Sequence, residues 1–262
     1  MLQLNVGIRL ASFGLPFRPA LARAAALGAE AVELDAQGEI QPAQLSPSAI
    51  REIRKLLEDH RLRVCAVRCQ TRLGYEVADQ LDRRIEATKQ AMTMAYKLGA
   101  SVVTNYVGQI PESAEDSRWG ALVDVLADLG RHGQRAGATL SARTGAERGE
   151  LLARLIQALP AGSLGVDFDP AALIFHGHSP REALTVLAPY VLHVRARDAV
   201  CEIAQGRGVA LPLGQGAADF PTLLGLLEQH QYRGYLTVEW EPSREAELQI
   251  RAAVIQLRSL FA

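Results

Sequence analysis

The chain has 262 residues and a formal net charge of −1, and 48% of its residues are hydrophobic. This length suits a single eight-stranded α/β barrel or two small domains. The near-zero charge argues against nucleic acid as a partner, because nucleic-acid-binding surfaces are usually basic. No run approaches the ~18 apolar residues of a membrane span, so no membrane partner is predicted.

The cysteines and the N-terminal sequence bear on the compartment. The three cysteines are Cys65, Cys69 and Cys201. An odd and small number of cysteines is typical of a reducing compartment. The first residues, MLQLNVGIRLASFG, show neither a basic leader nor a long apolar core. A cytoplasmic location is therefore expected.

One structural unit recurs along the chain: a short apolar run, then polar residues, then an amphipathic segment that often ends at a glycine. The predicted strands are residues 2–9, 31–35, 63–69, 101–107, 138–143, 164–169, 190–196 and 234–239. The predicted helices are residues 17–27, 46–60, 79–98, 117–136, 148–159, 180–187, 219–230 and 243–260.

Strands that alternate with helices at roughly 30 residues per unit predict a parallel sheet. The sheet could be open and doubly wound, or closed. Regular spacing, the chain length and a helix after the last strand favour closure. No Pro/Ser-rich linker interrupts the chain. The predicted fold is thus an α/β fold, a single (β/α)8 TIM barrel over residues 1–262.

The segment VCEIAQGRGVALPLGQG, residues 200–216, is long and rich in glycine. It is most simply a flexible loop. The alternative is that Gly206, Gly208, Gly214 and Gly216 cradle a phosphate on their backbone N–H groups.

Polar side chains gather where the predicted strands end, which is the end at which barrels place their functional groups. They are Arg9, Glu33, Asp35, Arg68, Gln70, Asn105, Arg143, Asp169, Arg195, Arg197, Glu239 and Glu241. Alternation places Asp167 with Asp169, and His193 with Arg195 and Arg197, on shared faces. The polarity of any one of these residues can be explained without a function, because a strand usually ends where the apolar core ends and polar residues begin there. Long charged side chains that point together into a barrel must, however, be paired or bind something.

Three stretches carry a family resemblance: LGVDFDPAALI, YVLHVRARD and LGQGAADFPTLLGLLEQHQYRGYLTVEWE. They resemble the sixth, seventh and eighth units of the sugar phosphate isomerase/epimerase family, the xylose isomerase-like TIM barrels. That family shares its fold with a DNA-repair endonuclease family. The net charge and the missing histidines disfavour a DNA-repair role.

The resemblance implies a divalent metal held by Glu, Asp, His and Glu from the fifth to the eighth strand. Asp169 and Glu239 match this pattern, but Arg143 replaces the first Glu and Arg195 replaces the His. His193 is one layer deeper and a poor substitute. A guanidinium has no lone pair to give and stays protonated. We therefore expect that the metal is lost and that Arg143 and Arg195 pair with Asp169 and Glu239 in its place.

The resemblance further implies a reaction of the isomerase or epimerase type on a small sugar or sugar-acid ligand. The expected catalytic residues are Glu239, Asp169 and Glu33. The expected substrate-binding residues are Arg9, Arg68, Asn105, Arg143, Arg195 and Arg197, because arginine suits phosphate and carboxylate groups.

Two alternatives stay open. The chain could be a non-catalytic relative whose metal site is filled by ion pairs. It could also be a metal-dependent isomerase that holds Mn, Zn or Mg through Asp169 and Glu239, with His176 or His178. The sequence leaves a homo-oligomer open.

Overall fold

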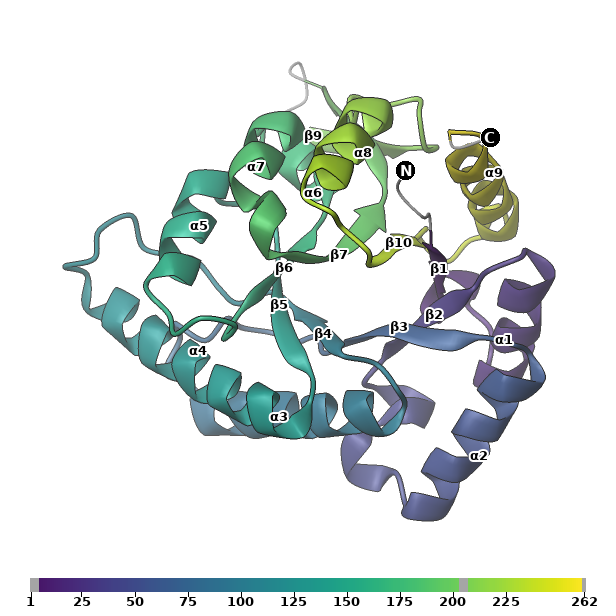
Figure 1. The fold of residues 1–262 in the computed structure, drawn as a ribbon, viewed down its shortest axis with the longest axis horizontal. Helices are drawn as coiled ribbons and strands as arrows, with labels where there is room; N and C mark the ends of the chain where they lie inside the picture. Colours follow the sequence, from purple (N-terminus) through teal and green to yellow (C-terminus); the bar gives the residue numbers. More distant parts are fainter. Residues whose placement is uncertain (1–4, 203–206, 261–262) are drawn as a thin grey trace.

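The computed structural model describes residues 5–202 and 207–260. Eight parallel strands close into a barrel in the order β1-β10-β7-β6-β5-β4-β3-β2 (Figure 1). Their bounds are β1 Asn5–Arg9, β2 Ala31–Asp35, β3 Arg63–Arg68, β4 Val102–Asn105, β5 Thr139–Arg143, β6 Gly165–Phe168, β7 Val191–Ala196 and β10 Tyr235–Val238. The predicted closed (β/α)8 barrel is confirmed; residues 2–4 of the first predicted strand lie outside the described residues.

Helices surround the barrel in Figure 1. Their bounds are α1 Phe17–Ala26, α2 Pro47–Asp59, α3 Leu81–Lys97, α4 Ser117–Ala136, α5 Gly149–Gln157, α6 Pro170–Phe175, α7 Pro180–Leu187, α8 Phe220–Gln229 and α9 Ala246–Ser259. Short 3₁₀ turns lie at Leu10–Phe13, Gly38–Ile40, Pro42–Gln44 and Ala188–Tyr190. The predicted helices are present with ends shifted by a few residues, and α6 is an addition. In the described part of the chain no helix is long and apolar enough to span a membrane.

Helix starts follow the capping chemistry of the sequence. Ser46 accepts a hydrogen bond from the Ala49 N–H, with Pro47 in the first helical position of α2. Ser179 accepts one from the Glu182 N–H ahead of Pro180, at the start of α7. A side-chain oxygen before a proline satisfies one otherwise unpaired N–H and fixes the direction in which the helix leaves its strand.

The barrel is polar inside and apolar outside. Outward positions such as Val166, Val194 and Leu236 are buried under the helices. Inward positions carry Cys65, Thr237 and, in the next layers, the charged groups described below; the Cys65 Sγ is 3.4 Å from the Thr237 Oγ1. Barrel interiors are usually filled by Val, Ile and Leu, so this interior must be held together by hydrogen bonds and ion pairs.

In the segment after β7, residues 200–202 and 207–211 are strand and not the predicted loop. The segment forms an antiparallel hairpin, β8 Asp198–Glu202 with β9 Arg207–Leu211. The hairpin packs on α6, where a Cβ at Gly208 would strike the Phe175 ring. Glycine at this position lets the strand backbone approach the ring closely.

The phosphate cradle is also wrong for Gly214 and Gly216. Both of their N–H groups donate to Asp198 Oδ2 at 2.9 Å, and the Ala218 N–H donates to Asp198 Oδ1 at 2.9 Å. A buried carboxylate of the chain itself therefore fills the anion site of this turn. Gly206 lies outside the described residues.

Candidate functional site

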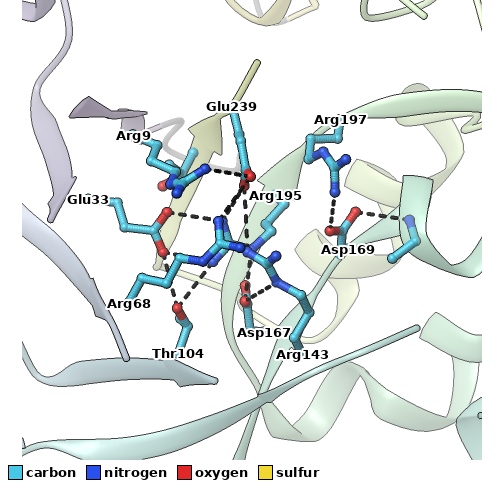
Figure 2. Close-up of polar contacts among 12 residues, drawn as sticks. Arg9, Glu33, Arg68, Thr104, Arg143, Asp167, Asp169, Arg195, Arg197 and Glu239 are labelled. Atoms are coloured by element: carbon cyan, nitrogen blue, oxygen red, sulfur yellow. Dashed lines mark hydrogen bonds and ion pairs between the residues drawn. The ribbon is translucent and has the colours of Figure 1, made fainter. Parts of the chain in front are cut away.

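Arg195 lies at the centre of the barrel and is fully buried. Its Nη2 and Nη1 donate to the two Glu33 oxygens at 2.7 and 3.0 Å. Nη1 also donates to Glu239 Oε2 at 2.6 Å, Nε donates to Asp167 Oδ2 at 2.8 Å, and Nη2 donates to Thr104 Oγ1 at 3.1 Å. Figure 2 shows this guanidinium between three carboxylates that come from three different strands or strand ends.

The central ion pairs fix the charge state of the barrel interior. Burial would lower the pKa of Arg195, but the carboxylates of Asp167, Glu33 and Glu239 outweigh burial and raise it. Burial would raise the pKa of Asp167, Glu33 and Glu239. Arg195, together with His193 and the neighbouring arginines, holds the pKa of all three below their usual range. All three carboxylates are therefore ionised at neutral pH.

Three further arginines surround Glu239 from the side of the mouth, the barrel end at which the strands finish. Arg9 Nη1 and Arg68 Nη1 each donate to Glu239 Oε1 at 3.0 Å. Arg143 Nη2 lies 3.5 Å from Glu239 Oε2, and its Nε donates to Asp167 Oδ2 at 3.3 Å. Arg9 also holds Asp35 with two hydrogen bonds. Glu239 thus has four guanidiniums around it, counting Arg195.

Asp169 is not part of this centre, and its expected pairing with Arg143 and Arg195 is wrong. Its Oδ1 accepts from the Ala172 N–H and caps α6, while its Oδ2 accepts from Arg197 Nη1 at 2.7 Å. Figure 2 shows the Asp169–Arg197 pair beside the central cluster. The Asp169–Pro170 dipeptide explains the difference, because an N-cap aspartate followed by proline starts a helix and turns the carboxylate toward it.

The residue that takes the expected place of Asp169 is Asp167, one layer deeper. Its Oδ1 accepts from His193 Nδ1 at 2.7 Å, and His193 Nε2 lies 2.8 Å from Thr237 Oγ1. Burial lowers the pKa of His193, but the hydrogen bonds to Asp167 and Cys65 and the charges of Asp167 and Glu33 together outweigh burial and raise the pKa to about 9. The alternation of strand β6 placed Asp167 on the Asp169 face, so the signal for an inward carboxylate was present.

The residues present do not fit the metal that the family resemblance implies. Arg143 and Arg195 offer positive N–H donors where two ligands would be needed. Glu239 and Asp169 already accept from guanidiniums. His176 is exposed, and His178 Nε2 lies 3.0 Å from the Ala146 carbonyl oxygen, so neither joins the centre. A dication here would have to displace Arg195 from a fully buried position.

A hollow of about 210 Å³ opens beside the cluster, at the ends of β3, β4 and β5. Arg68, Arg143 and Asn105 line it, together with Thr71 and Tyr106. Asn105 is held in place, since its Nδ2 donates to Tyr75 Oη at 2.8 Å and to Thr71 Oγ1 at 3.0 Å. Of the sequence-predicted binding residues, this hollow brings together Arg68, Arg143 and Asn105.

Two guanidiniums in the hollow keep unused hydrogen-bonding capacity. Arg143 Nη2 is buried and makes no hydrogen bond with any described residue. Arg68 donates only through Nη1 within the described chain. Burial and the neighbouring Arg143 charge lower the pKa of Arg68, yet an arginine stays protonated. A buried donor without a hydrogen bond costs about 1–3 kcal/mol. The ion pair of Arg143 Nη2 with Glu239 Oε2 offsets part of that cost, and a bound anion would remove the rest.

The charge balance points the same way. Five guanidiniums meet five carboxylates in and around the cluster, and His193 with a pKa of about 9 adds one positive charge at neutral pH. The groups are Arg9, Arg68, Arg143, Arg195, Arg197, Glu33, Asp35, Asp167, Asp169 and Glu239. This excess favours a monoanion in the mouth.

The fold and the site together define a (β/α)8 barrel whose central layer is closed by an arginine and whose mouth presents further arginines. The family model described as xylose isomerase-like TIM barrel matches residues 21–260, and the chain belongs to this family. Comparison with curated proteins gives no significant match.

Similar solved structures have the same fold. A xylose isomerase domain protein from Planctomyces limnophilus is 23% identical with a TM-score of 0.85, covering 98% of this chain and 95% of that one. A sugar phosphate isomerase/epimerase from Parabacteroides distasonis is 14% identical with a TM-score of 0.75, covering 97% and 93%. D-allulose 3-epimerase from Methylomonas in complex with D-allulose is 15% identical with a TM-score of 0.77, covering 100% and 98%.

Proposed function

We propose that this barrel binds a small sugar derivative carrying a phosphate or carboxylate group, without a metal at its centre. The observation that carries the proposal is the buried Arg143 Nη2 without a hydrogen bond, beside Arg68 in the 210 Å³ hollow. The size suits a compact ligand. The family membership and the D-allulose bound to the Methylomonas enzyme support a sugar as the rest of that ligand.

The same geometry favours binding over proton transfer. The carboxylates of Glu33, Glu239 and Asp169 all accept from guanidiniums, and the pKa values of Glu33 and Glu239 are lowered. A carboxylate held this way is a weak base, because protonation would break its ion pairs. An isomerase-type reaction through these residues stays a prediction. These ion pairs favour a binding role without catalysis, and the isomerase-type reaction is the second candidate.

Thermal melting with matched probes tests the proposal. We expect glucose 6-phosphate or gluconate to stabilise the chain, and glucose or D-allulose to do so less. A ligand at a hundredfold excess over Kd adds about 2.7 kcal/mol. Arg143→Met and Arg68→Met should remove the response. Arg131→Met, an exposed arginine on α4, serves as the control and should keep it.

Melting that does not change with any anion, while the arginine variants fold normally, would rule out the anion site. Equal stabilisation by charged and neutral sugars would show that the ligand does not bind through Arg68 and Arg143, and this would also contradict the proposal.

A further inference from the structure

A second cavity lies on the other side of the barrel from the Arg68–Arg143 hollow. It has a volume of about 120 Å³ and lies between the ends of β7 and β10, strand β9 and helix α9. Its walls are mostly apolar: Ala210, Leu211, Leu213, Val238, Trp240, Ile250 and Ala253. The two sites have one side chain in common, because Glu239 lines this cavity and also accepts a hydrogen bond from Arg68 of the hollow.

The size of this cavity is close to that of one ring. An apolar protein cavity of ~150 Å³ stays dry and binds benzene. At about 120 Å³, the cavity has room for a single small ring. The Trp240 ring supplies one wall, and aromatic rings pair favourably when stacked or edge-on.

The lining also has polar residues, which are Arg197, Asp198, Glu239, Glu241 and Gln249. Arg197 donates to Asp169 through Nη1, and its Nε and Nη2 donate to no residue of the described chain. Its guanidinium lies over the Phe175 ring at 5.8 Å, which holds its plane in place. Two acids of the lining are accounted for: Asp198 accepts from four backbone N–H groups, and Glu239 is bound by arginines.

Glu241 also lines the cavity, but its side chain is exposed to solvent. Water therefore screens its charge. The lining therefore combines apolar residues with an ion-paired guanidinium whose Nε and Nη2 bond no residue of the described chain. Most small-molecule sites combine an apolar lining with a few polar groups that orient the ligand.

We propose that this cavity is a second ligand site, which takes a small ring bearing a carboxylate, with the ring against Trp240 and the carboxylate on Arg197. Apart from Glu239, which contacts the arginines of the sugar-derivative site, the two sites have different lining residues, so variants of Ala253 or Arg68 test them separately. The ligand class follows from the cavity volume, its apolar wall and the free guanidinium donors.

Trp240 fluorescence gives a direct readout. The chain has two tryptophans. The other is Trp119 in α4, whose ring packs against Arg154 of α5; Trp119 does not line this cavity. In a Trp119→Phe background, titration with benzoate should change the Trp240 emission and reach saturation. Benzylamine should bind far more weakly than benzoate, and the affinity of benzyl alcohol should be intermediate.

Two variants test the placement. Ala253→Leu should fill the cavity and abolish the benzoate response, whereas Ala252→Leu, one position along α9 and exposed, should leave it intact. Arg197→Met should weaken benzoate about tenfold or more, as expected for a charge-assisted hydrogen bond, and should affect benzyl alcohol little. If Ala253→Leu fails to fold, Ala210→Val in β9 replaces it.

Linear, unsaturated quenching by benzoate would overturn the proposal. So would a response unchanged in Ala253→Leu or Arg197→Met, or benzylamine binding as tightly as benzoate. If glucose 6-phosphate still raises the melting temperature while benzoate leaves the Trp240 emission unchanged, this second site is ruled out and the sugar-derivative proposal stands. The reverse result would remove the sugar-derivative site alone.

Discussion

Replacing Arg195 by methionine separates the roles of its three carboxylate partners. Glu239 would keep Arg9 and Arg68 at 3.0 Å, and Asp167 would keep His193 at 2.7 Å and Arg143 at 3.3 Å. Glu33 would keep only the Thr104 hydroxyl, at 3.1 Å, among the hydrogen-bond donors of the described chain. The cost of Arg195→Met should therefore arise mainly at Glu33.

Removing one partner of a buried ion pair costs about 3–5 kcal/mol, because the other charge stays buried. We expect Arg195→Met to lower the free energy of unfolding by that amount. Domains have about 5–15 kcal/mol in total, so the variant should fold with a clearly lower urea midpoint. Adding Glu33→Gln should recover most of the loss. Adding Glu239→Gln should recover little, because Glu239 keeps two direct guanidinium hydrogen bonds.

The pH dependence should reverse between the two chains. In the native chain Glu33 has a lowered pKa, so its contribution to stability is present above ~pH 4.3 and is lost as pH falls. In Arg195→Met, burial should raise the pKa of Glu33, so stability should rise as pH falls from about 7 to 5. A loss of under about 1 kcal/mol, or equal rescue by Glu239→Gln, would refute this assignment.

Two other predictions concern single titrating groups. The pKa of His193 is raised to about 9, so protonated His193 contributes fully to the stability below ~pH 6.5, and this contribution is lost as pH rises through 9. The melting temperature should therefore fall at alkaline pH, and His193→Gln should remove this fall. Burial raises the pKa of Glu147 to about 7, and its Oε1 has no hydrogen-bond partner in the described chain. Glu147→Gln should therefore be more stable than the native chain at pH 8 and equal to it near pH 4. As a control, Glu115→Gln at an exposed position should not change the stability at either pH. A native chain more stable than Glu147→Gln at pH 8 would contradict this reasoning.

The barrel fold could be predicted from the sequence because each strand and helix is marked by a local pattern, and the same pattern recurs along the chain. Each strand is an apolar run, and several helices carry their own start signal, as Ser46–Pro47 and Ser179–Pro180 do. The four glycines of residues 200–216 favour a loop, whereas residues 200–202 and 207–211 are strand. The hairpin instead forms through tertiary contacts, since its backbone packs against Phe175 and the turn that follows is tied to Asp198.

The charged residues of the site were predictable, but their partners were not. Alternation within β7 placed His193, Arg195 and Arg197 on one inward face, as observed. Which carboxylate meets which arginine depends on the stagger between neighbouring strands, and a shift of one layer exchanges Asp169 for Asp167. Asp169–Pro170 carried a helix-start signal that would have placed Asp169 at the N-cap of α6.

The central claim is that Arg195 stands in the place of the family metal, and metal content measures it directly. The native chain and the double variant Arg143→Glu with Arg195→His are each incubated with Mn2+, desalted and analysed for bound metal per chain. The native chain should retain well under one Mn per chain, and the double variant, which restores the family ligand types, should retain about one. A native chain that holds one Mn per chain, and loses it in Asp169→Ala, would contradict the account.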